Sequence, residues 1–175
     1  MPDSVTIDIN IAMDAIDERR ERHRSALHLL QLADEGLVDI AVAPQGYRAD
    51  LDLPGPVRDQ VEHLLKSHGI PFLPQVARVS AVTYPSETLF PGAFSESLIS
   101  AWDTVIATWE THRSRKPEVP DRWHVETHLV AGRSLLLTND EPLVRMCQRL
   151  EAEHGLPIRA MNVEDYMKQR GTRPT

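Results

Sequence analysis

The sequence is poor in cysteine and in aromatic residues. Its single cysteine, Cys147, excludes an internal disulfide framework and a cysteine-ligated zinc site. This cysteine lies in a predicted helix with apolar periodicity, which indicates a buried structural thiol. Aromatic residues make up 5% of the 175 residues, too few for an extensive platform on which single-stranded bases stack.

The chain also lacks long apolar runs, a targeting segment and an excess of positive charge. No apolar run approaches the ~20 residues that span a bilayer, and the first residues lack the basic and apolar regions of a signal peptide. We therefore expect a cytoplasmic protein with no membrane partner. The formal net charge of −7 argues against a protein that coats nucleic acid through bulk positive charge. It does not exclude a nuclease, because acids clustered at a metal site contribute to such a total.

Strands and helices alternate along the chain. Apolar patterns predict strands at residues 5–9, 38–43, 134–137 and 156–160. They predict helices at residues 14–35, 57–68, 94–111, 121–131, 141–154 and 163–168, with a short helix near 47–51. Residues 70–82 read as an edge strand or coil, 83–92 as a loop and 114–120 as a linker. This order predicts an α/β fold of three layers, α/β/α, around a mostly parallel central sheet. We expect one domain over residues 1–170 and a disordered tail at 171–175.

Acidic residues stand at the ends of two predicted strands. Asp8 closes the first strand, and Asp140 follows the apolar strand at 134–137. Sites in parallel sheets form outside the carboxyl ends of the strands, so these carboxylates converge if the strands are neighbours. Converging carboxylates without a basic partner bind a divalent metal. Two simpler interpretations stay open, because Asp140 is a good helix N-cap before Pro142 and Asp121 is suited to a helix's first turn. Asp8 lies within an apolar strand, where a carboxylate without partners is costly.

Three motifs occur in order on suitable elements. They are Asp8-Ile-Asn10, then Asp121-Arg-Trp-His124 with Gly132 eleven residues after the acid, then Thr138-Asn-Asp140. With the strand and helix order, they resemble the PIN-domain family of ribonucleases, which includes the toxins of bacterial toxin–antitoxin pairs. The resemblance covers most of the chain, and the section from about residue 51 to 102 matches only loosely.

The resemblance implies a PIN-like endoribonuclease that hydrolyses RNA with Mg²⁺ or Mn²⁺. Asp8 and Asp140 are then the favoured direct ligands, and Asp121 holds a water or a second ion. The same resemblance implies that Asn10 orients the ligands, while Thr138 or Asn139 bonds the phosphate or a ligand carboxylate. It also implies a homodimer and, if the protein is a toxin, a small antitoxin partner.

One departure from the family pattern concerns the helix after the second strand. The family usually carries a glutamate there, and Tyr47 stands near its place in this sequence. Asp50 lies three residues further, one helical turn away, and is the candidate substitute. If Asp50 does not substitute, the alternative is a catalytically degenerate PIN-like domain that binds RNA or a protein. A phosphatase or phospho-acceptor domain is a third interpretation, but aspartate-nucleophile phosphatases typically have a second acid where Asn10 stands.

Basic and histidine residues supply further candidates. Arg113, Arg115 and Lys116 precede Asp121 and are candidate substrate contacts. The arginines at 19, 20, 22 and 24 alternate with acids and read as a salt-bridged surface. His124 and His128 have the spacing of a zinc pair, but no third ligand is apparent, so we expect His124 to be a satisfied histidine that faces the sheet.

Overall fold

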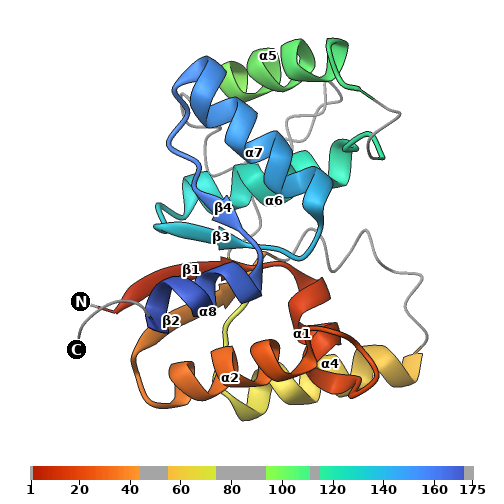
Figure 1. The fold of residues 1–175 in the computed structure, drawn as a ribbon, viewed down its shortest axis with the longest axis vertical. Coiled ribbons are helices and arrows are strands. Elements are labelled where there is room, and N and C mark those ends of the chain that lie inside the picture. Colours follow the sequence, from red (N-terminus) through yellow and green to blue (C-terminus); the bar gives the residue numbers. More distant parts are fainter. Residues whose placement is uncertain (1, 44–54, 74–93, 111–114, 172–175) are drawn as a thin grey trace, which may run out of the picture.

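A computed structural model describes residues 2–43, 55–73, 94–110 and 115–171. Within these ranges, helices and strands alternate as the sequence predicts (Figure 1). The elements in chain order are β1 (Asp3–Ile7), α1 (Ile9–Ile16), α2 (His23–Asp34), β2 (Val38–Val42), α4 (Gly55–Ser67), α5 (Phe94–Ala107), α6 (Val119–Val130), β3 (Leu135–Leu137), α7 (Glu141–His154), β4 (Ala160–Met161) and α8 (Val163–Gly171).

The described strands form one parallel sheet in the order β2-β1-β3-β4. β1 is central: Val5 pairs with Ile40 on one side and with Leu135 on the other. Beyond β2, Phe72 forms a single parallel bridge to Val42, so the described part of the expected edge strand at 70–82 does meet the sheet. Because every strand points the same way, the carboxyl ends of β1 and β3 lie side by side at one edge. The predicted mostly parallel sheet is confirmed.

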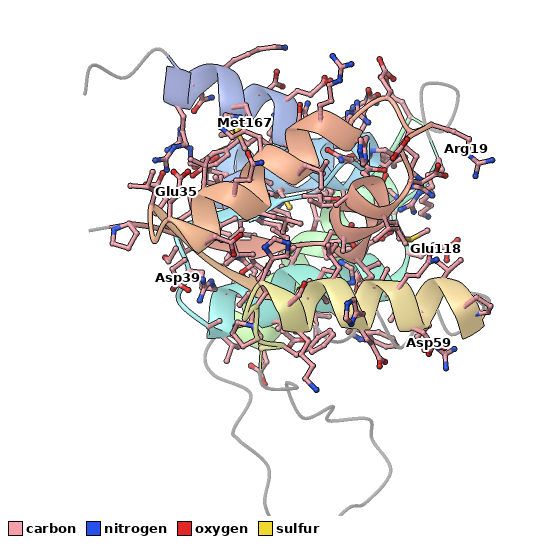
Figure 2. All side chains as sticks on the ribbon, turned by 90° about the horizontal axis from the view of Figure 1, so that it is seen from below. Arg19, Glu35, Asp39, Asp59, Glu118 and Met167 are labelled. Atoms are coloured by element: carbon pink, nitrogen blue, oxygen red, sulfur yellow. The ribbon has the colours of Figure 1, made fainter. Side chains whose placement is uncertain are left out.

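Helices cover both faces of the sheet, and alternate strand residues face opposite layers. In β3, Leu135 and Leu137 pack in the core beneath α1, α2, α4 and α8, whereas Leu136 packs in the core beneath α5, α6 and α7. Figure 1 shows these two helical layers on either side of the strands. The outer surface is charged, and Figure 2 shows the exposed side chains of Arg19 and Asp59 pointing away from the core. The result is the three-layer α/β/α architecture predicted from the sequence.

The helix predicted at residues 14–35 is instead two helices. α1 starts at Ile9, directly after Asp8, and a turn separates it from α2. Asp17 makes this turn, because its carboxylate accepts the Arg19 backbone N–H (3.1 Å) and its carbonyl accepts that of Arg20 (3.0 Å). An aspartate that bonds its own backbone competes with helix formation. Three of the four arginines of the basic run, Arg19, Arg20 and Arg22, therefore lie on this turn, with Arg20 paired to Asp14.

Other predicted boundaries differ by a few residues. α6 begins at Val119 because Glu118 and Asp121 form a reciprocal capping box with Pro120 in the first turn. α5 ends at Ala107, before the predicted residue 111, and β4 covers Ala160–Met161, so it shares only Ala160 with the strand predicted at 156–160. α7 has the predicted bounds, and Gly155 ends it with φ 66°. The expected short helix at 47–51 and the loop at 83–92 lie outside the described residues, as does most of the expected tail at 171–175.

Candidate acidic site at the carboxyl edge of the sheet

Asp8 stands at the junction between β1 and α1. Its backbone N–H still donates to the Leu137 carbonyl (3.0 Å), so the residue continues the ladder with β3. Its carbonyl accepts the Ile11 N–H (3.1 Å) and so begins the helix. The side chain makes no capping bond and is only 6% exposed. The carboxylate therefore projects into the protein at the carboxyl edge of the sheet.

Neutral donors hold one oxygen of the Asp8 carboxylate. Oδ2 accepts a hydrogen bond from the Thr138 hydroxyl (2.7 Å) and another from the Asn10 amide (2.8 Å). Oδ1 faces the ring of His124, whose Nδ1 is 3.6 Å away. Hydroxyl and amide donors favour the charged carboxylate but carry no charge to cancel it. Asp8 is thus a buried site of negative charge that a cation would stabilise.

Asp121 and Asp140 meet at one arginine. Arg115 donates from Nη1 to Asp121 Oδ2 (2.8 Å) and from Nη2 to Asp121 Oδ1 (3.1 Å), a two-pronged pair. The same Nη2 also donates to Asp140 Oδ2. Two carboxylates from different helix starts therefore share one cationic nitrogen. Arg115 itself is 46% exposed at its side chain, so solvent reaches this ion pair.

The Asp140 side chain does not act as a helix cap. Asp140 is the N-cap residue of α7, but its carboxylate makes no capping hydrogen bond and turns to Arg115 instead. Burial raises the pKa of this carboxyl, the charge of Arg115 opposes the rise, and the charges of Asp121 and Asp8 add to it. The negative charges of both other acids therefore act on the Asp140 carboxyl. Asp121, by contrast, does serve its helix, since its carboxylate also accepts the Glu118 N–H (2.7 Å).

Asn139 faces away from these acids. Its amide donates to Asp14 (2.5 Å), and its side-chain oxygen accepts the Val163 N–H (3.2 Å). It thus ties the end of β3 to α1 and α8 rather than offering its side chain to a phosphate. The sequence analysis missed Asp14, which is 6% exposed and stands among the buried residues of α1. The only signal was an acid on the apolar face of a short helix.

Of the three remaining predicted site residues, the structure describes one, Lys116. Lys116 is exposed beside Arg115 and accepts a hydrogen bond at its carbonyl from Arg115 (3.4 Å). Asp50, the candidate substitute for the missing glutamate, and Arg113 lie outside the described residues. What this edge brings together is therefore Asp8, Asn10 and Thr138 in one cluster and Asp121, Asp140 and Arg115 in another.

The two histidines of α6 have different environments. His128 is fully buried, and its Nδ1 lies 2.9 Å from the Thr6 hydroxyl. Burial lowers the pKa of His128 to about 4, and the charge of Arg133 adds to this effect. His124 is 5% exposed, and within the part of the chain that the structure describes neither of its ring nitrogens has a hydrogen-bond partner. The expectation that His124 is satisfied is therefore wrong, although it is buried as predicted.

The acids of this edge suit a hard divalent cation, with one condition. In the conformation described, no three Asp, Glu, His or Cys side chains of the described residues stand close enough to bind one ion. Arg115 occupies the space between Asp121 and Asp140, so a metal there requires the guanidinium to leave. Neutral donors hold Asp8 Oδ2, so Oδ1 and the His124 ring 3.6 Å away are the candidate ligand atoms for an ion. Mg²⁺ often needs only one or two protein ligands and keeps waters in the other positions.

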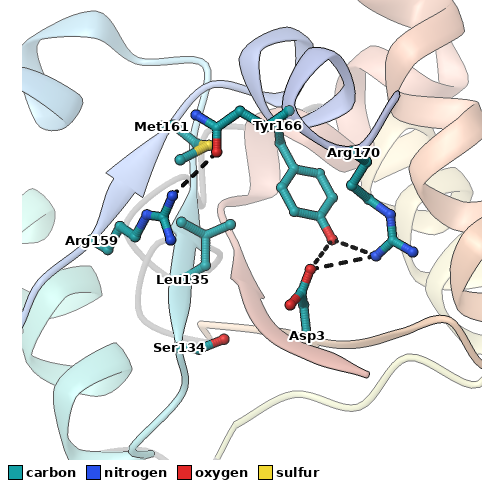
Figure 3. Close-up of a pocket in the computed structure, with 8 residues that line it drawn as sticks. Asp3, Ser134, Leu135, Arg159, Met161, Tyr166 and Arg170 are labelled. Atoms are coloured by element: carbon teal, nitrogen blue, oxygen red, sulfur yellow. Dashed lines mark hydrogen bonds and ion pairs between the residues drawn. The ribbon is translucent and has the colours of Figure 1, made fainter. Parts of the chain in front are cut away.

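A small pocket at the opposite edge of the sheet does not compete with this site (Figure 3). It measures about 80 Å³ and lies by the start of β1 and β3. Asp3 there accepts hydrogen bonds from Tyr166 (3.1 Å) and Arg170 (3.4 Å), and Arg159 donates to Gln169 (3.2 Å). Asp3 thus pairs with Arg170, and Arg159 bonds the neutral amide of Gln169. No described helix is long and apolar enough to cross a membrane.

Comparison with known proteins adds no relative. No protein-family model matches this sequence, and no curated protein matches it either. The resemblance to PIN domains therefore rests on the three sequence motifs.

Proposed function

We propose that this protein is a divalent-metal-dependent endoribonuclease of the cytoplasm that hydrolyses phosphodiester bonds of RNA. One observation carries the proposal. Asp8, Asp121 and Asp140 belong to three separate stretches of chain, yet contacts link them at one edge of a parallel sheet. Arg115 bridges Asp121 and Asp140, and the Thr138 hydroxyl accepts the Asp140 N–H (3.1 Å) and donates to Asp8 (2.7 Å). Such an edge is where parallel α/β folds place their sites. Carboxylates gathered there are the ligands that Mg²⁺ and Mn²⁺ prefer.

Each residue then has a distinct task. A bound Mg²⁺ or Mn²⁺ ion supplies an activated water and neutralises charge on the scissile phosphate. Asp8 and Asp140 would hold the ion directly, and Asp121 would hold a water or a second ion. Thr138 and Asn10 fix the Asp8 carboxylate through hydrogen bonds of 2.7 and 2.8 Å. Such partners set the orientation of a ligand and so contribute to metal affinity.

Arg115 has two positions in this proposal. Without an ion it neutralises Asp121 and Asp140. When an ion takes over that role, the half-exposed guanidinium turns to the phosphate of the RNA, for which its planar fork is suited. Lys116 beside it contributes charge, and Arg113 belongs to the same basic stretch. The family resemblance adds a homodimer and, for a toxin, a small antitoxin protein.

The test is cleavage of a mixed pool of single-stranded and structured RNAs by the purified protein. It is run with Mn²⁺, with Mg²⁺ and with chelator, for the wild type and for Asp140→Asn. Asp59→Asn is the matched control, since Asp59 is an exposed acid of α4. We expect cutting that needs metal, is lost in Asp140→Asn and persists in Asp59→Asn. Equal cutting by Asp140→Asn, or cutting in chelator, contradicts the proposal.

A second candidate is a degenerate PIN-like domain that binds RNA or a protein without cutting. Two observations favour it: Arg115 already neutralises two of the acids, and no three metal-binding side chains converge among the described residues. This candidate predicts RNA or protein binding of equal affinity with and without chelator, together with no cleavage. Fluorescence anisotropy with labelled RNA measures the first property, and the cleavage assay measures the second.

A further inference from the structure

His124 is the buried polar side chain of this edge that its surroundings leave unsatisfied. Both ring nitrogens are inaccessible to solvent and lack a hydrogen-bond partner among the described residues, and the whole residue is only 5% exposed. Leaving a buried polar group unpaired costs about 1–3 kcal/mol. Native proteins rarely accept this cost without a functional reason, an ion or a water.

The His124 side chain lies at the acidic edge of the sheet, close to Asp8. It follows Asp121 by three residues on α6, so the two side chains lie on one side of the helix. Its Nδ1 is 3.6 Å from Asp8 Oδ1, on the side of the carboxylate opposite the Thr138 and Asn10 donors. The separation is too long for a hydrogen bond. Two atoms bound to one ion at about 2.1 Å lie about 3.0 Å apart in octahedral and about 3.4 Å apart in tetrahedral geometry. A small rotation of either side chain meets those values.

We propose that His124 and Asp8 bind the same metal ion, through an imidazole nitrogen and a carboxylate oxygen, and that this pair selects a transition-metal ion such as Mn²⁺ over Mg²⁺. The inference rests on the proposed function and narrows it to a particular ion. Mg²⁺ prefers oxygen ligands almost exclusively, whereas imidazole nitrogen suits first-row transition metals. An all-carboxylate site has no such preference.

The neighbouring histidine does not share the ion. His128 follows one turn later, but its Nδ1 is engaged by Thr6 (2.9 Å) in the contact between α6 and β1. The pair therefore does not form the two-histidine zinc site that the spacing suggests. Arg115 does not interfere either, because it contacts Asp121 and Asp140 and not Asp8. Asp8 and His124 are thus ligands that Arg115 does not contact, whereas Asp140 joins the same ion only when Arg115 has turned away.

Electron spin echo spectroscopy of the Mn²⁺-loaded protein tests this inference, because it detects nitrogen bound to the ion. We expect ¹⁴N modulation in the wild type, replaced by a ¹⁵N pattern when the protein is grown with ¹⁵N-histidine. His124→Asn removes the modulation, and the exposed His28→Asn in α2 retains it. Calorimetry adds that His124→Asn reduces the preference for Mn²⁺ over Mg²⁺ on the order of tenfold. If His124→Asn does not fold, His124→Gln replaces it, because the ¹⁵N-histidine label alone does not distinguish His124 from the other histidines.

The outcomes separate this inference from the proposed function. Bound Mn²⁺ without histidine modulation overturns the inference, and metal-dependent RNA cleavage in the same preparation leaves the nuclease standing. Histidine modulation without any cleavage supports His124 as a ligand and contradicts the nuclease. A wild type that binds no Mn²⁺ contradicts both. Modulation that survives in His124→Asn overturns the assignment, since another histidine is then the ligand.

Discussion

At the scale of single residues, the buried polar groups decide what this protein can do. Asp8, Thr138 and His128 are almost wholly removed from water, and each meets specific partners across more than a hundred residues of chain. A buried group that is held in one protonation state makes stability depend on pH. A carboxylate that is paired with an arginine binds a metal ion only when the arginine is displaced. Both consequences are measurable here.

His128 predicts loss of stability in mild acid. Its pKa falls from 6.5 to about 4 because the neutral ring is buried, so the unfolded chain binds this proton more readily between those pH values. The contribution of the neutral His128 ring to the free energy of unfolding is fully present above pH 6.5. It is lost as the pH falls toward 4, and the total loss is about 3 kcal/mol. Urea unfolding at several pH values measures this. In His128→Gln the loss over this range is smaller by that amount, and an unchanged loss contradicts the assignment.

The ion pairs of Arg115 predict that this residue competes with a metal ion for Asp121 and Asp140. Its guanidinium neutralises Asp121 and Asp140, so an ion that binds them must first displace it. Displacing a half-exposed ion pair costs up to about 1 kcal/mol, so Arg115→Ala should bind Mn²⁺ roughly fivefold more tightly. Calorimetric titration measures the affinity. Lys116→Ala is the control, because it removes the same charge one residue away, and a weaker affinity in Arg115→Ala rejects competition.

At the scale of elements, the sequence predicts best the helices whose ends carry clear capping residues, proline or glycine. α7 has its predicted bounds because Asp140 and Pro142 begin it and Gly155 ends it. The start of α6 was placed two residues late, since a glutamate at the N-cap is a weak signal and Glu118 acts only together with Asp121. The break between α1 and α2 was missed because Asp17 makes its turn with neighbouring backbone inside a run of charge.

The end of α7 at Gly155 leads to a prediction about helix termination. It adopts φ 66°, and an added Cβ would meet no atom within 4 Å, so a substitution there strains only the backbone. We expect Gly155→Ala to lower the free energy of unfolding by about 1 kcal/mol. Gly55→Ala is the control, since Gly55 begins α4, also has open space and needs no positive φ. Urea unfolding distinguishes them, and equal stability of the two variants contradicts this account of the α7 terminus.

At the scale of the whole molecule, strand order explains why distant acids lie near one another. β1 and β3 are neighbours in the sheet, so Asp8 and the residues after Leu137 share its carboxyl edge despite the long chain between them. The sequence alone supported this much, because alternating strands and helices imply a parallel sheet. It could not show that Arg115 bridges two acids, that Asn139 faces Asp14 or that His124 lacks partners. Those contacts depend on side-chain directions at the meeting of separate elements, which no local pattern encodes.

We propose that RNA hydrolysis depends on a divalent ion held at this edge by Asp8, Asp121 and Asp140. The most direct measurement is the RNA cleavage rate against Mn²⁺ concentration, beside the Mn²⁺ affinity from calorimetry, for the wild type and Asp8→Asn. The account predicts a saturable rate in the wild type whose midpoint matches the measured affinity, with rate and affinity both lost in Asp8→Asn. Cleavage that is independent of Mn²⁺, or is unchanged in Asp8→Asn, contradicts it.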